Sequence, residues 1–212
     1  MATPTDADAA ARRRRVSVAG HTGRPTIARA GLDDVDERVR VAALRALGRL
    51  DRLDDADLVT ALADGAPAVR VAALELAAAR GGPPIAVALD DADPTVVESA
   101  CWACGERPSS DTVVARLAEL SRDHDDPLVR EAAVAALGAI GDDAGLPAVL
   151  AAGHDKPAVR RRAVLALAAF EGPDVDAAWA RARLDRDRQV RDAVDELLGP
   201  VDDETVSADP GP

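Results

Sequence analysis

A short phrase, Val-Arg-x-x-Ala, returns along this chain in four clear and two weaker copies at a nearly constant distance. The valines that anchor the copies are separated by 30, 27, 33, 30 and 31 residues: Val39, Val69, Val96, Val129, Val159 and Val190. Such a period is the signature of a repeat array, in which one unit buries its apolar face only against its neighbours. This constraint excludes most globular folds.

Each copy has the internal pattern of a helix. Counting from the anchor, apolar residues fall at +4, +7, +8 and +11, as in Ala43, Ala46, Leu47 and Leu50, which form one face of a 3.6-residue period. A shorter apolar segment precedes each copy, and glycines such as Gly138 follow as expected helix ends. Aromatic residues make up only 1% of the chain, too few to fill a sandwich or barrel. The sequence therefore predicts an all-α, right-handed α-solenoid of about six helix pairs.

The two ends of the chain lack the period. Residues 1–20 contain the run Arg12 to Arg15 and are predicted to form a disordered arm. Residues 21–199 are predicted to form the solenoid, and residues 200–212 an acidic disordered tail.

The repeated pattern Asp-x-x-Pro-x-Val-Arg-x-x-Ala resembles HEAT repeats, specifically the short type first named from bilin lyases, over roughly residues 22–198. The resemblance implies a ladder in which one Asp and one Arg of each repeat join neighbouring repeats. The positions that match it are Asp34, Arg40, Asp64, Arg70, Arg130, Arg160, Asp185 and Arg191. The Asp is also expected to cap the second helix.

The third repeat departs from this ladder, because Val97 replaces its arginine. His124 and His154 stand at the Asp position of the fourth and fifth repeats, with Asp125 and Asp155 beside them. The third repeat is therefore predicted to be a bend or a seam, although simple divergence of a middle repeat would leave the same trace.

Second helices line the concave surface of HEAT-like solenoids, so their +2 and +6 positions are expected to face a groove. These positions hold the predicted partner-binding residues Val41, Arg45, Val71, Glu75, Glu98, Trp102, Glu131, Arg161 and Leu165. Trp102 has two readings of equal weight: an exposed anchor for a protein partner, or a side chain that packs over small neighbours.

No catalytic, cofactor-binding or metal-binding residue is predicted. Cys101 and Cys104 align with core leucines and valines, and an i, i+3 pair on a helix lies too far apart for an unstrained disulfide. Iron-binding hydroxylases built from similar repeats use His-Glu pairs. Here Thr22, Asp125 and Asp155 follow the three histidines, so those histidines are expected at caps and turns.

The charge of the chain bears on its partners. With 38 acidic against 26 basic residues, the net charge of −12 disfavours nucleic-acid binding. No apolar run is long enough for a membrane span, and two cysteines without a secretory signal favour the cytoplasm. We therefore expect a monomeric, non-enzymatic scaffold or adaptor that needs no cofactor and binds a protein in its concave groove.

Two alternatives stay open. One is a metal- or tetrapyrrole-handling enzyme of the short-HEAT type. The other is nucleic-acid binding through the arginine-rich C-terminal repeats, although the aspartates intermixed there favour solvated ion pairs.

Overall fold

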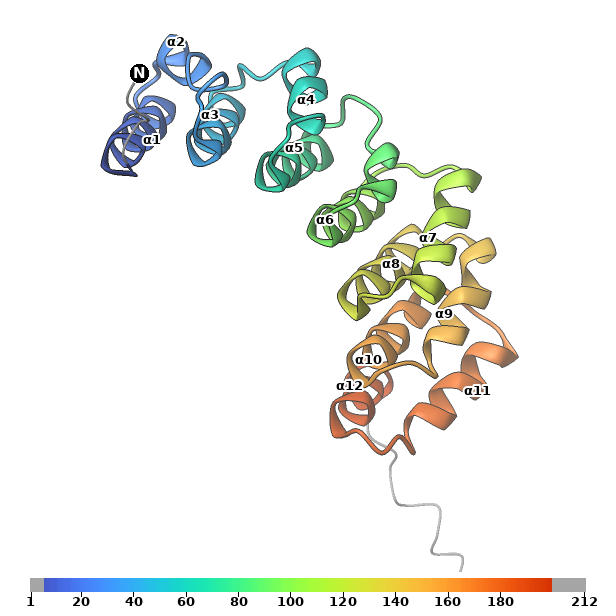
Figure 1. The fold of residues 1–212 in the computed structure, drawn as a ribbon. Coiled ribbons are helices and arrows are strands. Elements are labelled where there is room, and N and C mark those ends of the chain that lie inside the picture. Colours follow the sequence, from blue (N-terminus) through green and yellow to red (C-terminus); the bar gives the residue numbers. More distant parts are fainter. Residues whose placement is uncertain (1–5, 200–212) are drawn as a thin grey trace, which may run out of the picture. The chain divides into compact units, whose positions relative to one another are not determined.

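The computed structural model describes residues 6–199, and over that range the chain is helical and contains no strand (Figure 1). The α-helices are α1 (Asp6–His21), α2 (Pro25–Arg29), α3 (Glu37–Arg49), α4 (Asp55–Leu62), α5 (Pro67–Arg80), α6 (Pro94–Gly105), α7 (Asp111–Asp123), α8 (Pro127–Ile140), α9 (Leu146–Ala152), α10 (Pro157–Ala166), α11 (Pro173–Ala182) and α12 (Arg188–Leu198). Three 3₁₀ turns accompany them: η1 (Ala86–Asp90), η2 (Asp143–Gly145) and η3 (Leu167–Ala169).

The helices form the six predicted pairs of an α-solenoid, in which a short first helix precedes a longer second one. The pairs are α2–α3, α4–α5, η1–α6, α7–α8, α9–α10 and α11–α12. In the third pair the first element is reduced to the single 3₁₀ turn η1. The all-α prediction is therefore confirmed.

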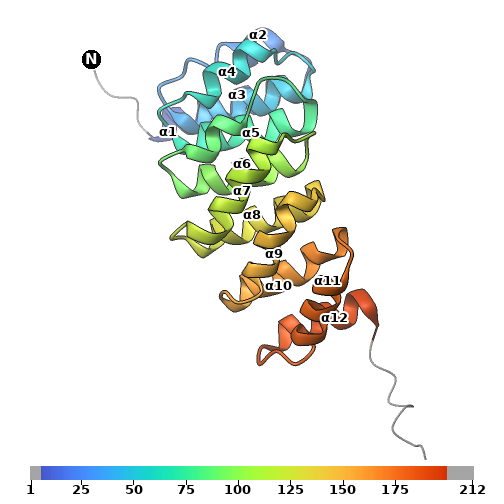
Figure 2. The ribbon, with the colours of Figure 1, turned by 90° about the vertical axis from the view of Figure 1, so that its right-hand side faces the viewer.

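The chain divides into two compact units between Val113 and Val114, within α7. In unit 1, the second helices α3, α5 and α6 pack in succession (Figure 1). In unit 2, α8, α10 and α12 do the same (Figure 2). The division comes directly after the repeat in which Val97 replaces the ladder arginine.

The disordered arm predicted for residues 1–20 is wrong for residues 6–20, because they form most of helix α1. Val16 and Ala19 are buried where α1 packs on α3, so α1 acts as an additional second helix ahead of the first pair. The arginine run hides this apolar face in the sequence. Residues 1–5 and the predicted tail at 200–212 lie outside the described residues.

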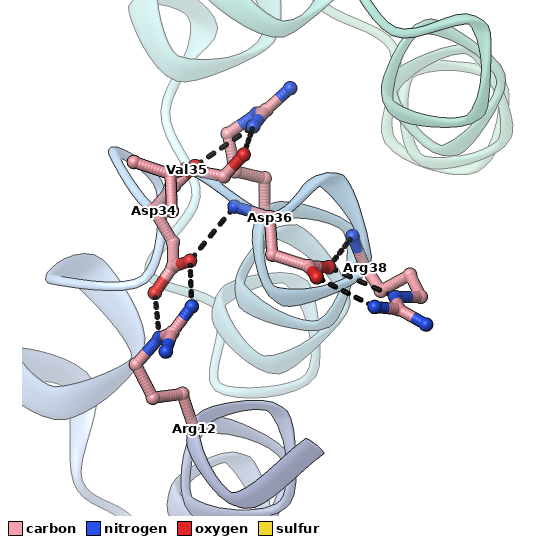
Figure 3. Close-up of polar contacts among 6 residues, drawn as sticks. Arg12, Asp34, Val35, Asp36 and Arg38 are labelled. Atoms are coloured by element: carbon pink, nitrogen blue, oxygen red, sulfur yellow. Dashed lines mark hydrogen bonds and ion pairs between the residues drawn. The ribbon is translucent and has the colours of Figure 1, made fainter. Parts of the chain in front are cut away.

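Aspartates start several second helices, but they are not the ladder aspartates. Asp36, Asp93, Asp126 and Asp187 are the N-caps, and each accepts the backbone N–H two residues further on. The capping role expected for Asp34 is therefore wrong. Its Oδ1 instead accepts the N–H of Asp36, 2.9 Å away, which fixes the turn before the helix (Figure 3).

Arginine forks, in which two nitrogens of one guanidinium donate to the two oxygens of one carboxylate, join neighbouring repeats inside each unit. In the first, Nε and Nη2 of Arg12 donate to the two carboxylate oxygens of Asp34 at 2.7 and 3.0 Å (Figure 3). Four more forks have the same two-bond geometry: Arg40–Asp64 and Arg70–Asp91 in unit 1, and Arg130–Asp155 and Arg160–Asp185 in unit 2. In the four later forks, Nη1 donates to a backbone carbonyl five or six residues earlier in its own repeat. Each of these guanidiniums therefore fixes its own turn and the next repeat together.

Four ladder positions depart from the regular arginine–aspartate pattern. Val97 is fully buried, so an apolar side chain occupies the arginine position of the third repeat. His124 takes the Asp role within its own turn, because its Nδ1 accepts the N–H of Asp126 at 3.1 Å. In the fifth repeat the fork is accepted by Asp155, and His154 is left outside the ladder. Arg191, in the last repeat, donates to the backbone carbonyl of Asp185, and within residues 6–199 it has no aspartate fork.

Small residues let second helices approach closely. A Cβ placed on Gly138 would lie 2.7 Å from the Cα of Ala166, and one on Gly20 would lie 2.8 Å from the Cα of Ala46. Gly138 is therefore a packing residue and does not end the helix. Helix α8 continues to Ile140, and Gly141 then terminates it in the left-handed conformation, with φ 68°.

We expect Arg160→Ala to lower the free energy of unfolding by about 2–4 kcal/mol. The carboxylate of Asp185 is largely shielded from solvent, and the substitution removes the guanidinium that pairs with it. The matched control in the same unit is Arg188→Ala, whose ion pair with Asp192 is largely exposed and contributes less than about 0.5 kcal/mol. Urea unfolding followed by circular dichroism measures both. Equal losses in the two variants would contradict a stabilising role for the ladder.

The same fork predicts a dependence on acid. The bonds from Arg160 hold the pKa of the Asp185 carboxyl below its usual 3.8, against the opposing effect of burial. A lowered folded-state pKa contributes stability that is complete above about pH 4 and is lost as the pH falls through the folded value. The stability difference between wild type and Asp185→Asn should therefore shrink from pH 6 to pH 2. Unfolding curves across this range test it, and a constant difference would refute it.

Candidate functional site

The predicted groove residues of unit 1 lie on its three second helices. We call Val41, Arg45, Val71, Glu75, Glu98 and Trp102 the unit-1 face. Two of them come from each of α3, α5 and α6, which pack in succession, so the six side chains form a continuous strip. Val41 and Val71 are half-buried, and the other four are exposed.

The chemistry of the unit-1 face is mixed. Nη2 of Arg45 donates to the carboxylate of Glu75 at 3.1 Å, and since both side chains are about half exposed, the pair neutralises itself at low cost. Trp102 is 45% exposed, the one aromatic side chain among the exposed large apolar residues of the described chain. The indole therefore lies outside the core of unit 1.

The corresponding residues of unit 2 are less accessible. Glu131, Arg161 and Leu165 are all half-buried. Leu165 packs with Trp179 against the buried cluster that contains Val164 and Val190. Glu131 accepts the guanidinium of Arg162 at 3.2 Å. Unit 2 thus offers little exposed apolar surface at these positions.

The two cysteines belong to the interior. Cys101 and Cys104 are free thiols, 0% and 5% exposed, on the buried side of α6. Burial raises the pKa of the Cys104 thiol to about 11, although the charge of Arg107 opposes this slightly. A thiol held protonated in this way is a poor nucleophile and a poor metal ligand.

The histidines do not converge. His21 ends α1, His124 is used in its own turn, and His154 is exposed. Among residues 6–199 no group of three or more His, Cys, Asp or Glu side chains is arranged to hold a metal ion. In the same range no helix combines the length and apolar character that a membrane crossing requires.

The arginines near the C-terminal end of the described chain are partly committed to neighbours. Arg183 contacts Asp195 and the carbonyl of Gly199, and Arg188 contacts Asp192. Nearby, Phe170 is buried, and Trp179 donates its indole N–H to the carbonyl of Val164 at 3.3 Å. This end of unit 2 is therefore held by local pairs and by aromatic packing.

Burial of the thiols predicts their reactivity. At pH 8 we expect Cys101 and Cys104 to react with a disulfide reagent at least about a hundredfold more slowly in the native protein than in urea, because both thiols are buried and burial raises the pKa of Cys104. Absorbance of the released thiolate measures the rate. Rapid reaction of native protein would contradict the interior placement of the pair.

Residues 82–155 match the family model for HEAT repeats, and no curated protein matches the sequence. A solved structure of human deoxyhypusine hydroxylase with glycerol is similar at 22% identity and TM-score 0.48, covering 91% of this chain and 80% of that one. A designed armadillo repeat protein in complex with the peptide (KR)4 is similar at 16% identity and TM-score 0.47, covering 92% and 94%. The segment 82–155 is therefore similar to HEAT repeats, and the helix pairs of the described residues are those of an α-solenoid.

Proposed function

We propose that this protein is a non-enzymatic scaffold that binds a protein partner on its second helices, with the unit-1 face as the main contact. The observation that carries the proposal is the exposed indole of Trp102. Exposed tryptophans are strongly enriched among the residues that dominate binding energy at interfaces. Aromatic residues make up only 1% of this chain, and yet the indole of Trp102 is exposed and not packed in the core. Exposure of this apolar surface to water is unfavourable, and burial against a partner would remove that cost.

The surroundings of Trp102 suggest how a partner would be selected. Val41 and Val71 extend the apolar strip, and the Arg45–Glu75 pair carries no net charge. Glu98, one turn before Trp102 on α6, adds a negative charge. A partner segment that presents an apolar side chain beside a basic one fits this arrangement. Glu131, Arg161 and Leu165 are proposed as secondary contacts.

A rigid strip needs little ordering when the partner binds. Its side chains are fixed to helices that pack against one another, so a smaller entropy cost opposes binding than for a flexible loop. We propose that the protein acts as a monomer in the cytoplasm and without a cofactor.

We expect Trp102→Ala to weaken partner binding by about 2 kcal/mol, close to thirtyfold, because it removes the largest exposed apolar contact of unit 1. Leu184→Ala is the matched control, since Leu184 is 87% exposed on the turn before α12. Affinity capture from native lysate with wild type and both variants identifies the partner, and titration of the purified partner gives the affinities.

Circular dichroism and thermal unfolding of each variant separate binding from folding. Loss of the partner in a Trp102→Ala protein that keeps its helicity and midpoint supports the proposal. Equal capture by all three proteins overturns it, and so does unfolding of Trp102→Ala, which would make the indole a core residue.

A further inference from the structure

Unit 2 contains a pocket of about 350 Å³ between its last two repeats, on the side of the Arg160–Asp185 fork. Its floor is apolar and includes Val149, Leu150, Val164 and Val190, from α9, α10 and α12. Pockets that hold small ligands have volumes of about 300–1,000 Å³, mostly apolar walls and a few polar groups that fix orientation. The volume of this pocket therefore falls at the lower end of that range, and its lining combines an apolar floor with several charged side chains.

The mouth of the pocket is basic. Arg181, Arg186 and His154 line it, all three are exposed, and within residues 6–199 no hydrogen bond or ion pair occupies their side chains. The two carboxylates in the lining, Asp155 and Asp185, already accept the forks of Arg130 and Arg160. Uncompensated positive charge thus remains at the entrance.

Unit 1 has the same gap between its first two repeats, with the opposite chemistry. The neighbouring first helix and its turn line both gaps from the same four positions: Asp57, Thr60, Ala61 and Asp64 in unit 1, and Ala178, Arg181, Ala182 and Asp185 in unit 2. In unit 1, Asp57 accepts a hydrogen bond from the guanidinium of Arg29 at 2.7 Å, so the charges that line that gap pair with each other. In unit 2, Ala178 leaves the space open and Arg181 replaces a neutral threonine.

We propose that the unit 2 pocket binds a small organic carboxylate with an apolar body. The carboxylate would accept the planar donors of Arg181 and Arg186, a geometry for which guanidinium is well suited. The apolar body would lie against the floor of the pocket, where Leu150 is half-buried and Val149, Val164 and Val190 form the buried layer beneath. This site lies in unit 2 and does not depend on the unit-1 face.

The test uses octanoate as the probe, with octanamide as its neutral counterpart and inorganic phosphate as an anion without an apolar body. Backbone NMR titration of the full chain locates the binding. We expect shifts at Gly153, Ala182 and Val190, and none at Ala61 and Val69 in the matched gap of unit 1. Octanoate should bind about tenfold or more tightly than either control probe, because only it satisfies both parts of the pocket.

Two variants test the residues. Arg181→Thr installs the residue that unit 1 carries at this position and should weaken octanoate about tenfold. Gly153→Asp should weaken it as well, because a Cβ on Gly153 would lie 3.3 Å from Nη2 of Arg181 and its carboxylate would occupy that guanidinium. Gly153→Asn is the neutral control for shape, and Arg188→Ala is the control for loss of a surface cation.

The titrations and the variants together decide whether the unit 2 pocket binds a carboxylate. Octanoate binding in unit 2 that falls with Arg181→Thr and Gly153→Asp but survives in Gly153→Asn and Arg188→Ala supports the proposal. Equal binding of octanoate and octanamide, equal binding of octanoate and phosphate, or no shifts in unit 2 at millimolar octanoate overturns it. Unchanged thermal midpoints of the variants ensure that a loss of binding is not a loss of fold.

Discussion

The fork between an arginine and the aspartate of the next repeat is the interaction that organises this chain. An isolated helix pair of this length cannot bury its apolar face, so each repeat depends on its neighbour. Apolar contact draws neighbouring repeats together without fixing their orientation, whereas the two bonds of a fork fix the orientation of one repeat against the next. In four of the five forks one guanidinium binds the carbonyl of its own turn and the carboxylate of the following repeat, and that carboxylate in turn accepts a backbone N–H of its own turn. Turn, helix start and spacing between repeats are thereby fixed together.

Apolar periodicity and turn residues predicted the helix pairs well, because both act within a few residues of the chain. The failures have specific physical causes. Helix α1 was missed because its arginine run masks the buried Val16 and Ala19, and Arg12 was therefore not recognised as a ladder residue. Asp155 was assigned beside the ladder because the fifth repeat is one residue shorter between its Asp and its Arg. Only the folded turn reveals that shift.

The surface was less predictable than the core. The sequence identified the +2 and +6 rows, but it left open whether Trp102 is exposed, since exposure depends on the volume of residues from neighbouring helices. It marked the C-terminal repeats as rich in arginine, but it did not indicate that Arg181 and Arg186 border a pocket in unit 2. That pocket arises from Ala178, Arg181 and His154, three residues that look ordinary in the sequence and meet only when successive repeats stack. Periodicity describes what repeats share, whereas a site arises where one repeat differs from another.

The close approach at Gly20 and Gly138 has a consequence beyond packing. Where helices contact through glycine and alanine, their axes lie nearer than leucine or phenylalanine would allow. Equivalent side chains on the outside of such helices then lie closer to one another than they would across a leucine contact. An Ala-rich interior therefore sets a short and fixed spacing between successive helices and between the groups on their surface. A binding segment must match that spacing along its own length.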